Sequence, residues 1–183
     1  MAACYILIIL IQNFLLLSTA SSNIEIDQEQ KILEDFYRHT DGDRWKNNEN
    51  WLKDEDICSW YGVICVSSEQ PSIKSLYLRS NSLSGFIPTF IFDLPSLTEI
   101  DFSDNEAITS FDFERIENAK NLAYLNLDGT ELTSLTGLEK AVSIKFFSCA
   151  ACGLSGAIPE WFGNFLGLQH LNLNNNRLSG PIP

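Results

Sequence analysis

The second half of the chain alternates apolar and polar positions in short runs that recur at a nearly fixed interval. Leu76-Tyr77-Leu78 is one such run, because its two leucines share one face of an extended segment while the tyrosine lies on the other. Each run belongs to a longer pattern that ends in an asparagine-type position. These positions are spaced 24, 25, 22 and 24 residues apart, at Asn81, Asn105, Thr130, Cys152 and Asn176. The pattern predicts one short strand in each of about five repeats.

A strand this short cannot bury its apolar face alone, which favours a stack of similar coils. Coils stacked about 4.8 Å apart form a parallel sheet over one continuous core. The asparagine-type position follows each strand, where its amide can bond backbone groups that the turn leaves unpaired. Thr130 and Cys152 can do less of this, so we expect the third and fourth coils to be held less firmly. The expected inward column is Leu76, Ile100, Leu125, Phe147 and Leu171.

Three coils carry a second signature, Leu-Ser-Gly-x-Ile-Pro, which begins at Leu83, Leu154 and Leu178. Together with the strand pattern, it resembles the plant-type leucine-rich repeat, in which this signature forms a second short strand beside the concave sheet. Residues 108–116 and 132–138 lack Gly-x-Ile-Pro, so the resemblance gives no reason to expect the second strand there. The implied fold class is an α/β repeat solenoid, a right-handed coil with a concave parallel sheet and a disulfide-linked helical N-terminal cap.

The residues before the repeats predict that cap. The run at 27–30 resembles a capping box, and apolar residues then recur on one helical face until Asp41-Gly42. The run C-S-W-Y-G-V-I-C from Cys58 to Cys65 matches the C-x-W-x-G-V-x-C marker of caps in plant-type leucine-rich-repeat proteins, which implies a Cys58–Cys65 disulfide. A cap is required because the first coil would otherwise expose its apolar edge.

The first residues of the chain have the character of a secretory signal. An apolar stretch runs from Tyr5 to Leu17 and is followed by small residues up to Ala20, although no Lys or Arg precedes it. The alternative is an uncleaved anchor, but about 13 residues is short for a membrane span of roughly 20. The predicted organisation is a signal peptide at 1–20, the cap at 21–70, and a solenoid of about five coils at 71–183 that ends without a C-terminal cap.

The net charge of −12 makes nucleic acid and anionic membrane surfaces poor partners, because both require basic patches. Acidic residues are concentrated between Asp93 and Glu139, where Arg115 and Lys120 are the only basic residues. A solvated face is one interpretation of this belt, and an affinity for a basic partner or a divalent cation is the other.

Cys149 and Cys152 form a C-x-x-C, which would suit a redox or metal pair. Their places in the repeat, an inward position and an asparagine-type position, instead predict two buried small residues. A zinc site would want four ligands, and only His39 and His170 are available elsewhere. The chain also lacks a nucleophile–base set and a phosphate-binding glycine loop. We therefore expect no enzyme, no cofactor and no metal site.

Residues that alternate with the inward positions are the candidates for ligand binding, because they point out from the concave face. Aromatic anchors beside hydrogen-bonding groups make a recognition surface, although three aromatic residues in one column could also arise by chance. The candidates are Tyr77, Arg79, Glu99, Asp101, Ser103, Tyr124, Asn126, Asp128, Phe146, His170, Asn172 and Asn174.

The resemblance, which covers about residues 26–183, extends to receptor-kinase ectodomains and polygalacturonase-inhibiting proteins. It implies a secreted or extracellular recognition module that binds a protein, peptide or cell-wall carbohydrate. The alternative is the N-terminal ectodomain fragment of a cell-surface receptor, attached to the membrane only through a missing C-terminal part. A structural wall protein without a specific ligand is a third hypothesis. The uncapped C-terminal coil also leaves self-association open.

Overall fold

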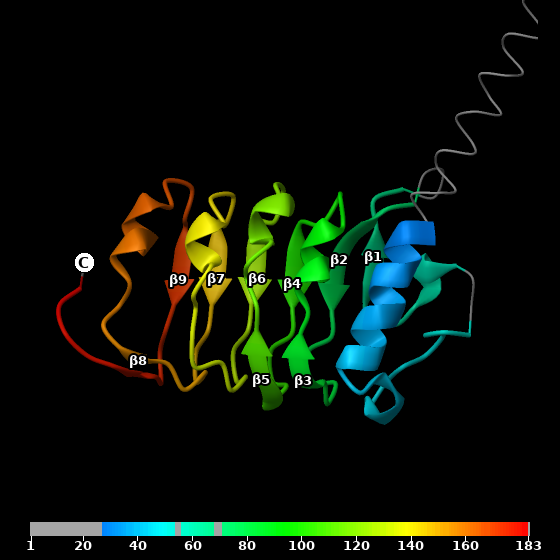
Figure 1. Cartoon of the computed structure of the whole chain (residues 1–183), viewed down its shortest axis with the longest axis horizontal. Helices are drawn as coiled ribbons and strands as arrows, with labels where there is room; N and C mark the ends of the chain where they lie inside the picture. The colour runs from blue at the N-terminus through cyan, green and yellow to red at the C-terminus, as the bar shows by residue number, and fades with distance from the viewer. Residues whose placement is uncertain (1–26, 54–55, 68–70, 183) are drawn as a thin grey trace, which may run out of the picture.

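The computed structural model describes residues 27–53, 56–67 and 71–182 of the chain. The predicted signal peptide at 1–20 lies outside these ranges. Within them, a helical end piece is followed by a row of stacked coils, which Figure 1 shows running from the blue helix to the red C-terminal segment.

One long sheet lines one side of the coils. In the described part of the chain its strands follow the order β1-β2-β4-β6-β7-β9, and every pairing is parallel except that of β1 with β2. Each coil contributes one strand, as the repeat interval predicts. The strands are β1 (Val63–Cys65), β2 (Ile73–Tyr77), β4 (Glu99–Asp101), β6 (Tyr124–Asn126), β7 (Phe146–Ser148) and β9 (His170–Asn172). We number the coils one to five by the strands from β2 to β9.

The inward residues of these strands stand in register. The inward residues of coils one to four are fully buried. Leu171, the inward residue of coil five, is 38% exposed because it lies on the outermost described coil. The predicted interior column is therefore confirmed. Along the sheet its members pair in the order Leu76, Ile100, Leu125, Phe147 and Leu171.

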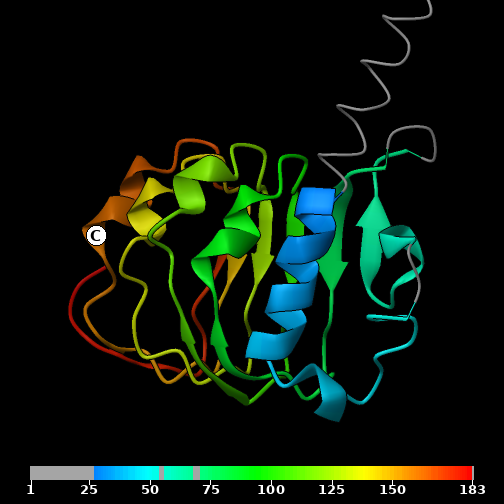
Figure 2. The same cartoon turned by 45° about the vertical axis from the view of Figure 1, so that its right-hand side comes forward.

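Short 3-10 helices close the coils on the side opposite the sheet, as Figure 2 shows. Each buries one or two apolar residues against the inward column, so the core is a single layer between sheet and helices. The helices of the coils are η3 (Thr89–Asp93), η4 (Ile116–Asn118), η5 (Leu138–Lys140) and η6 (Glu160–Asn164).

A second row of short strands follows the asparagine-type positions, but it is interrupted. β3 (Ser84–Ile87) pairs with β5 (Ala107–Phe111), and β8 (Ser155–Gly156) pairs with β10 (Arg177–Leu178). Residues 131–136 of coil three, all described, form no strand. The missing Gly-x-Ile-Pro made a second strand doubtful in coils two and three. Coil three has none, but for coil two this expectation is wrong, because Ile108 and Phe111 are buried there and β5 forms.

The asparagine-type positions tie neighbouring coils together. Asn105 Oδ1 accepts the backbone N–H groups of Asn81 and Leu83 at 2.9 and 3.0 Å, and its Nδ2 donates to the carbonyl of Leu78 at 3.0 Å. Thr130 has only a hydroxyl, which donates to Leu127 O of its own coil at 2.6 Å. The predicted role of the amide, and its loss where threonine replaces it, are both confirmed.

Cys149 and Cys152 are fully buried, as their places in the repeat predict. They are also joined by a disulfide of 2.07 Å, which the repeat pattern did not indicate. The bond closes a short loop directly after β7. It links the inward position of coil four to the asparagine-type position of the same coil, so coil four has a covalent tie where coils one, two and five have an amide.

The end piece is built on a helix over residues 27–39 and a cluster of tryptophans. The helix buries Leu33 and Phe36, and Phe36 contacts the rings of Trp45 and Trp51 at centroid distances of 5.8 and 6.3 Å. Glu29, on the first turn, accepts the N–H of Ile73 at 2.6 Å and so joins the helix to β2. The cap therefore covers the apolar edge of coil one.

The C-x-W-x-G-V-x-C run forms the edge of the cap that meets the sheet. Cys58 and Cys65 form the expected disulfide, with an S–S distance of 1.98 Å. Gly62 has a φ of 80°, and a Cβ built there would lie 2.4 Å from the carbonyl oxygen of Tyr77. Glycine is therefore required where β1 joins β2.

Candidate ligand-binding face

The outward residues of the sheet form columns across the coils, because the parallel strands pair in register. One column lies at the start of the strands and a second lies two residues further along. The columns are Ser75, Glu99, Tyr124, Phe146 and His170, and then Tyr77, Asp101, Asn126, Ser148 and Asn172. We call this surface, with Arg79, Asp104 and Asp128 at the strand ends, the concave face.

Three rings of the first column form a continuous stack. Tyr124 and Phe146 have centroids 4.4 Å apart at an angle of 14°, and Phe146 and His170 are 4.4 Å apart at 5°. The strand spacing of about 4.8 Å brings rings at equivalent positions into van der Waals contact. These rings, the ring stack, are partly or largely exposed, so they form a preorganised apolar strip across coils three to five.

Polar contacts fix the part of the face that lies on coils one and two. The hydroxyl of Tyr77 donates to Glu99 Oε2, and Ser75 Oγ donates to the same oxygen at 3.4 Å. Arg79 Nε donates to Asp104 Oδ2 at 2.8 Å, and this bond is the main reason that the pKa of Arg79 is raised. The cation of Arg79 is therefore already paired.

Asp101 and Asp128 are each fixed through one oxygen. Asp101 Oδ1 accepts the backbone N–H and the hydroxyl of Ser103, at 3.0 and 2.5 Å. Asp128 Oδ1 accepts the hydroxyl of Ser148 at 2.5 Å and the N–H of Ala150 at 2.6 Å. The second oxygen of each carboxylate has no hydrogen-bond partner among the described residues.

The pKa of Tyr124 is raised above its ordinary value of 10.0, first because the ring is partly buried. The hydrogen bond from Asn126 Nδ2 opposes this rise, and the negative charges of Asp101, Asp128 and Glu99 add to it. The phenol of Tyr124 therefore lies within the field of three carboxylates from coils two and three.

The structure does not bring all twelve predicted candidates to the surface. Ser103 is 2% exposed and Asn126 is 9% exposed, so both support the face from below. Asp104 was missed by the alternation rule, because the chain turns at this residue, which has a φ of 57°. The only signal in the sequence was its place one residue before the asparagine-type position Asn105.

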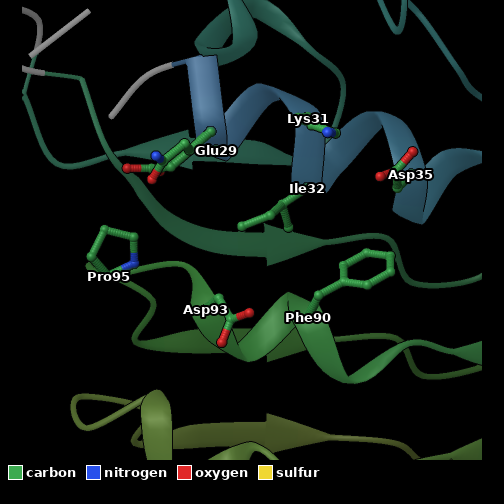
Figure 3. A pocket seen from close by; sticks show the side chains of 8 residues that line it. Glu29, Lys31, Ile32, Asp35, Phe90, Asp93 and Pro95 are labelled. Atoms are coloured by element: carbon green, nitrogen blue, oxygen red, sulfur yellow. The ribbon is translucent and has the colours of Figure 1, made fainter. Parts of the chain in front are cut away.

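A cavity of about 570 Å³ lies away from the concave face, between the helix 27–39 and η3. Figure 3 shows Ile32 and Phe90 facing it, with Asp93 at one side. Asp93 is bound by Arg115 at 2.6 Å and by Asn118 at 2.8 Å, so its charge is already compensated. Over the described ranges no group of three or more His, Cys, Asp or Glu residues could hold a metal ion.

Comparison with known families assigns the architecture. A leucine-rich-repeat N-terminal domain model matches residues 26–66, and leucine-rich-repeat models match residues 71–132 and 167–183. The chain belongs to the plant-type leucine-rich-repeat proteins. This assignment agrees with the resemblance drawn from the repeat and cap motifs.

Plant proteins are among the relatives of this leucine-rich-repeat chain. It is 31% identical over 139 residues to Receptor-like protein 35 of Arabidopsis thaliana, covering 75% of this chain and 14% of that protein. It is 35% identical over 81 residues to the polygalacturonase inhibitor of Pyrus communis, and this match covers 44% of this chain and 24% of the inhibitor. Among solved structures, a chain of the BIR3–SERK2 complex of Arabidopsis thaliana matches with a TM-score of 0.62 at 27% identity. The match covers 75% of this chain and 73% of that chain.

The leucine-rich-repeat chain thus spans less than a quarter of the length of the two named sequence relatives, at 14% and 24%. Its described residues include no helix that is both long and apolar enough to cross a membrane. The fold is that of extracellular and cell-surface leucine-rich-repeat proteins, which is compatible with binding a ligand outside the cell.

Proposed function

We propose that this chain is an extracellular, non-catalytic recognition module that binds a protein or peptide partner on its concave face. The observation that carries the proposal is the ring stack of Tyr124, Phe146 and His170. A solvated face gains nothing from three aligned rings, whereas aromatic anchors supply much of the binding energy at protein interfaces. The stack is also fixed by the register of the sheet, so little entropy is lost when a partner binds.

The relatives support a protein partner. The polygalacturonase inhibitor of Pyrus communis is named for its action on an enzyme, and the BIR3–SERK2 structure is a complex between two proteins. The chemistry of the face agrees, because its rings and fixed carboxylates offer apolar contact beside hydrogen-bond acceptors. The same face would serve a secreted binding protein or the outer part of a receptor.

The test uses the mature secreted chain and a library of short randomised peptides. We expect the selected peptides to lose about tenfold or more in affinity with Phe146→Ala and with Tyr124→Ala, which each remove one ring of the stack. The matched control is Phe86→Ala, because Phe86 lies on β3, outside the concave face, and is 48% exposed. Equal binding by all four proteins would refute the concave-face proposal.

A further inference from the structure

We propose that the partner segment bound by the concave face carries an arginine, whose guanidinium stacks on Tyr124 and bonds Glu99 and Asp101. This inference rests on the proposed function, and it names the chemistry of the partner. It is drawn from three features of the concave face in the described part of the chain: the sheet face has no partner, one face of the Tyr124 ring is not covered by another ring, and the charge around that ring is negative.

The stack is open on only one side of Tyr124. Phe146 covers one face of the tyrosine ring, and the other face points toward coil two, where the strand partner of Tyr124 is Glu99. Among the described residues no other ring contacts Tyr124. The hydrogen bond from Tyr77 holds the Glu99 carboxylate toward coil one, away from Tyr124, so a planar group lying on the open face of Tyr124 would have that carboxylate on its far side.

The charge around this open face is negative and unbalanced. Glu99, Asp101 and Asp128 all act on the phenol of Tyr124. The described basic residue of the same face, Arg79, is paired with Asp104 at 2.8 Å, and its charge also acts on Asp101 and Asp128. With Glu99, the face thus has four carboxylates around this one arginine. A cation from a partner would therefore find an excess of carboxylates beside an aromatic ring, and the electrostatic attraction would hold it there.

The negative charge of Asp101 is not required by the fold. Its Oδ1 accepts the N–H two residues further on, and Asn126 and Asn172 make the same bond in coils three and five, at 3.1 and 3.2 Å. A neutral amide thus performs the structural task at this position. Apart from its electrostatic effect on Arg79, the charge of Asp101 is left for a partner.

The geometry favours arginine over lysine. Both hydrogen bonds to Glu99 go to Oε2 and both to Asp101 go to Oδ1, so each carboxylate has one oxygen without a partner among the described residues. A planar guanidinium can stack on a ring and donate to two carboxylate oxygens at once, which a compact ammonium cannot. The same charges disfavour an acidic polysaccharide as the ligand.

The experiment compares two double variants with the same change in net charge. Glu99→Gln with Asp101→Asn removes the two carboxylates and keeps their shape. Glu131→Gln with Glu160→Gln is the matched control, because both residues are exposed and lie outside the concave face. The probes are peptides selected from the randomised library on the wild-type chain, each resynthesised with citrulline, the neutral isostere, in place of arginine.

We expect the selected peptides to be enriched in arginine. Their affinity should fall about tenfold or more when citrulline replaces arginine, and also when they bind the Glu99→Gln, Asp101→Asn double variant. The control double variant should change affinity by less than about twofold. Peptides that are sensitive to Phe146→Ala, but are not enriched in arginine and bind the concave-face double variant normally, would overturn this inference and leave the proposed function standing. Peptides insensitive to every concave-face variant, or a library that yields no binder, would overturn both.

Discussion

Phe36 of the cap helix stacks on Phe102 of coil two, with ring centroids 5.3 Å apart and an interplanar angle of 22°. The cap thus reaches past coil one and packs against the core of the coil beyond it. Both rings are fully buried, so the contact joins two parts of the chain that are distant in sequence into one cooperative unit.

Phe36→Ala is expected to lower the free energy of unfolding by about 3–5 kcal/mol, because it leaves a cavity between the cap and the first two coils. Urea denaturation followed by tryptophan fluorescence measures the loss, since Trp45 and Trp51 contact the ring. Phe86→Ala, at a half-exposed ring, serves as the control and should change stability by far less. Equal effects of the two substitutions would show that the Phe36–Phe102 contact contributes little.

Cys58→Ser should destabilise the cap and reduce the secreted yield. The disulfide closes a short loop, and on the chain-entropy model such a link contributes about 2.5 kcal/mol. Secreted protein in the medium and the melting temperature are the measurements. Wild-type values for both would mean that the cap is held without this bond.

Asn105→Ala should cost more than Thr130→Ala, although both residues occupy the same position of the repeat. Asn105 bonds the N–H groups of Asn81 and Leu83 and the carbonyl of Leu78, and each buried group left unpaired costs about 1–3 kcal/mol. Thr130 donates a single side-chain bond to the backbone, to Leu127 O, so about 1 kcal/mol is expected for its loss. Chemical denaturation of both variants tests the ranking, and equal losses would contradict the bridging role of the amide.

Tyr124 should ionise at a higher pH than an exposed tyrosine, because partial burial and the nearby carboxylates raise its pKa above 10.0. Since the folded chain holds this proton more tightly than the unfolded chain, the stabilisation is complete below pH 10.0 and is lost as pH rises through the folded pKa. Titration by NMR with a ring-labelled tyrosine measures the value. Asp101→Asn should lower the pKa, because it removes one of the repelling charges, and an unchanged pKa would place Asp101 too far away to act.

Much of the fold follows from the sequence because one period governs it. The interval that places Leu76, Ile100 and Leu125 in one interior column also stacks Tyr124 on Phe146, so the core and the ring stack share one cause. Asn105 and Thr130 could likewise be ranked from their side chains alone.

Other features depend on turns and contacts that no period encodes. Asp104 reaches Arg79 only because the chain turns at a left-handed residue after β4. Ser103 and Asn126 are buried, although alternation places them outward. The strand β5 forms because Ile108 and Phe111 find places in the core, which compensates for the missing signature.

The interruption of the outer strands at coil three has a mechanical consequence. The pairs β3–β5 and β8–β10 each resist separation of their own coils, but no strand pairing spans residues 131–136 between them. We therefore expect the row of coils to bend most readily at its middle. Tyr124 and Phe146 begin the sheet strands of coils three and four, on the other side of the core from this interruption. Bending between the two coils would therefore change the distance between their rings.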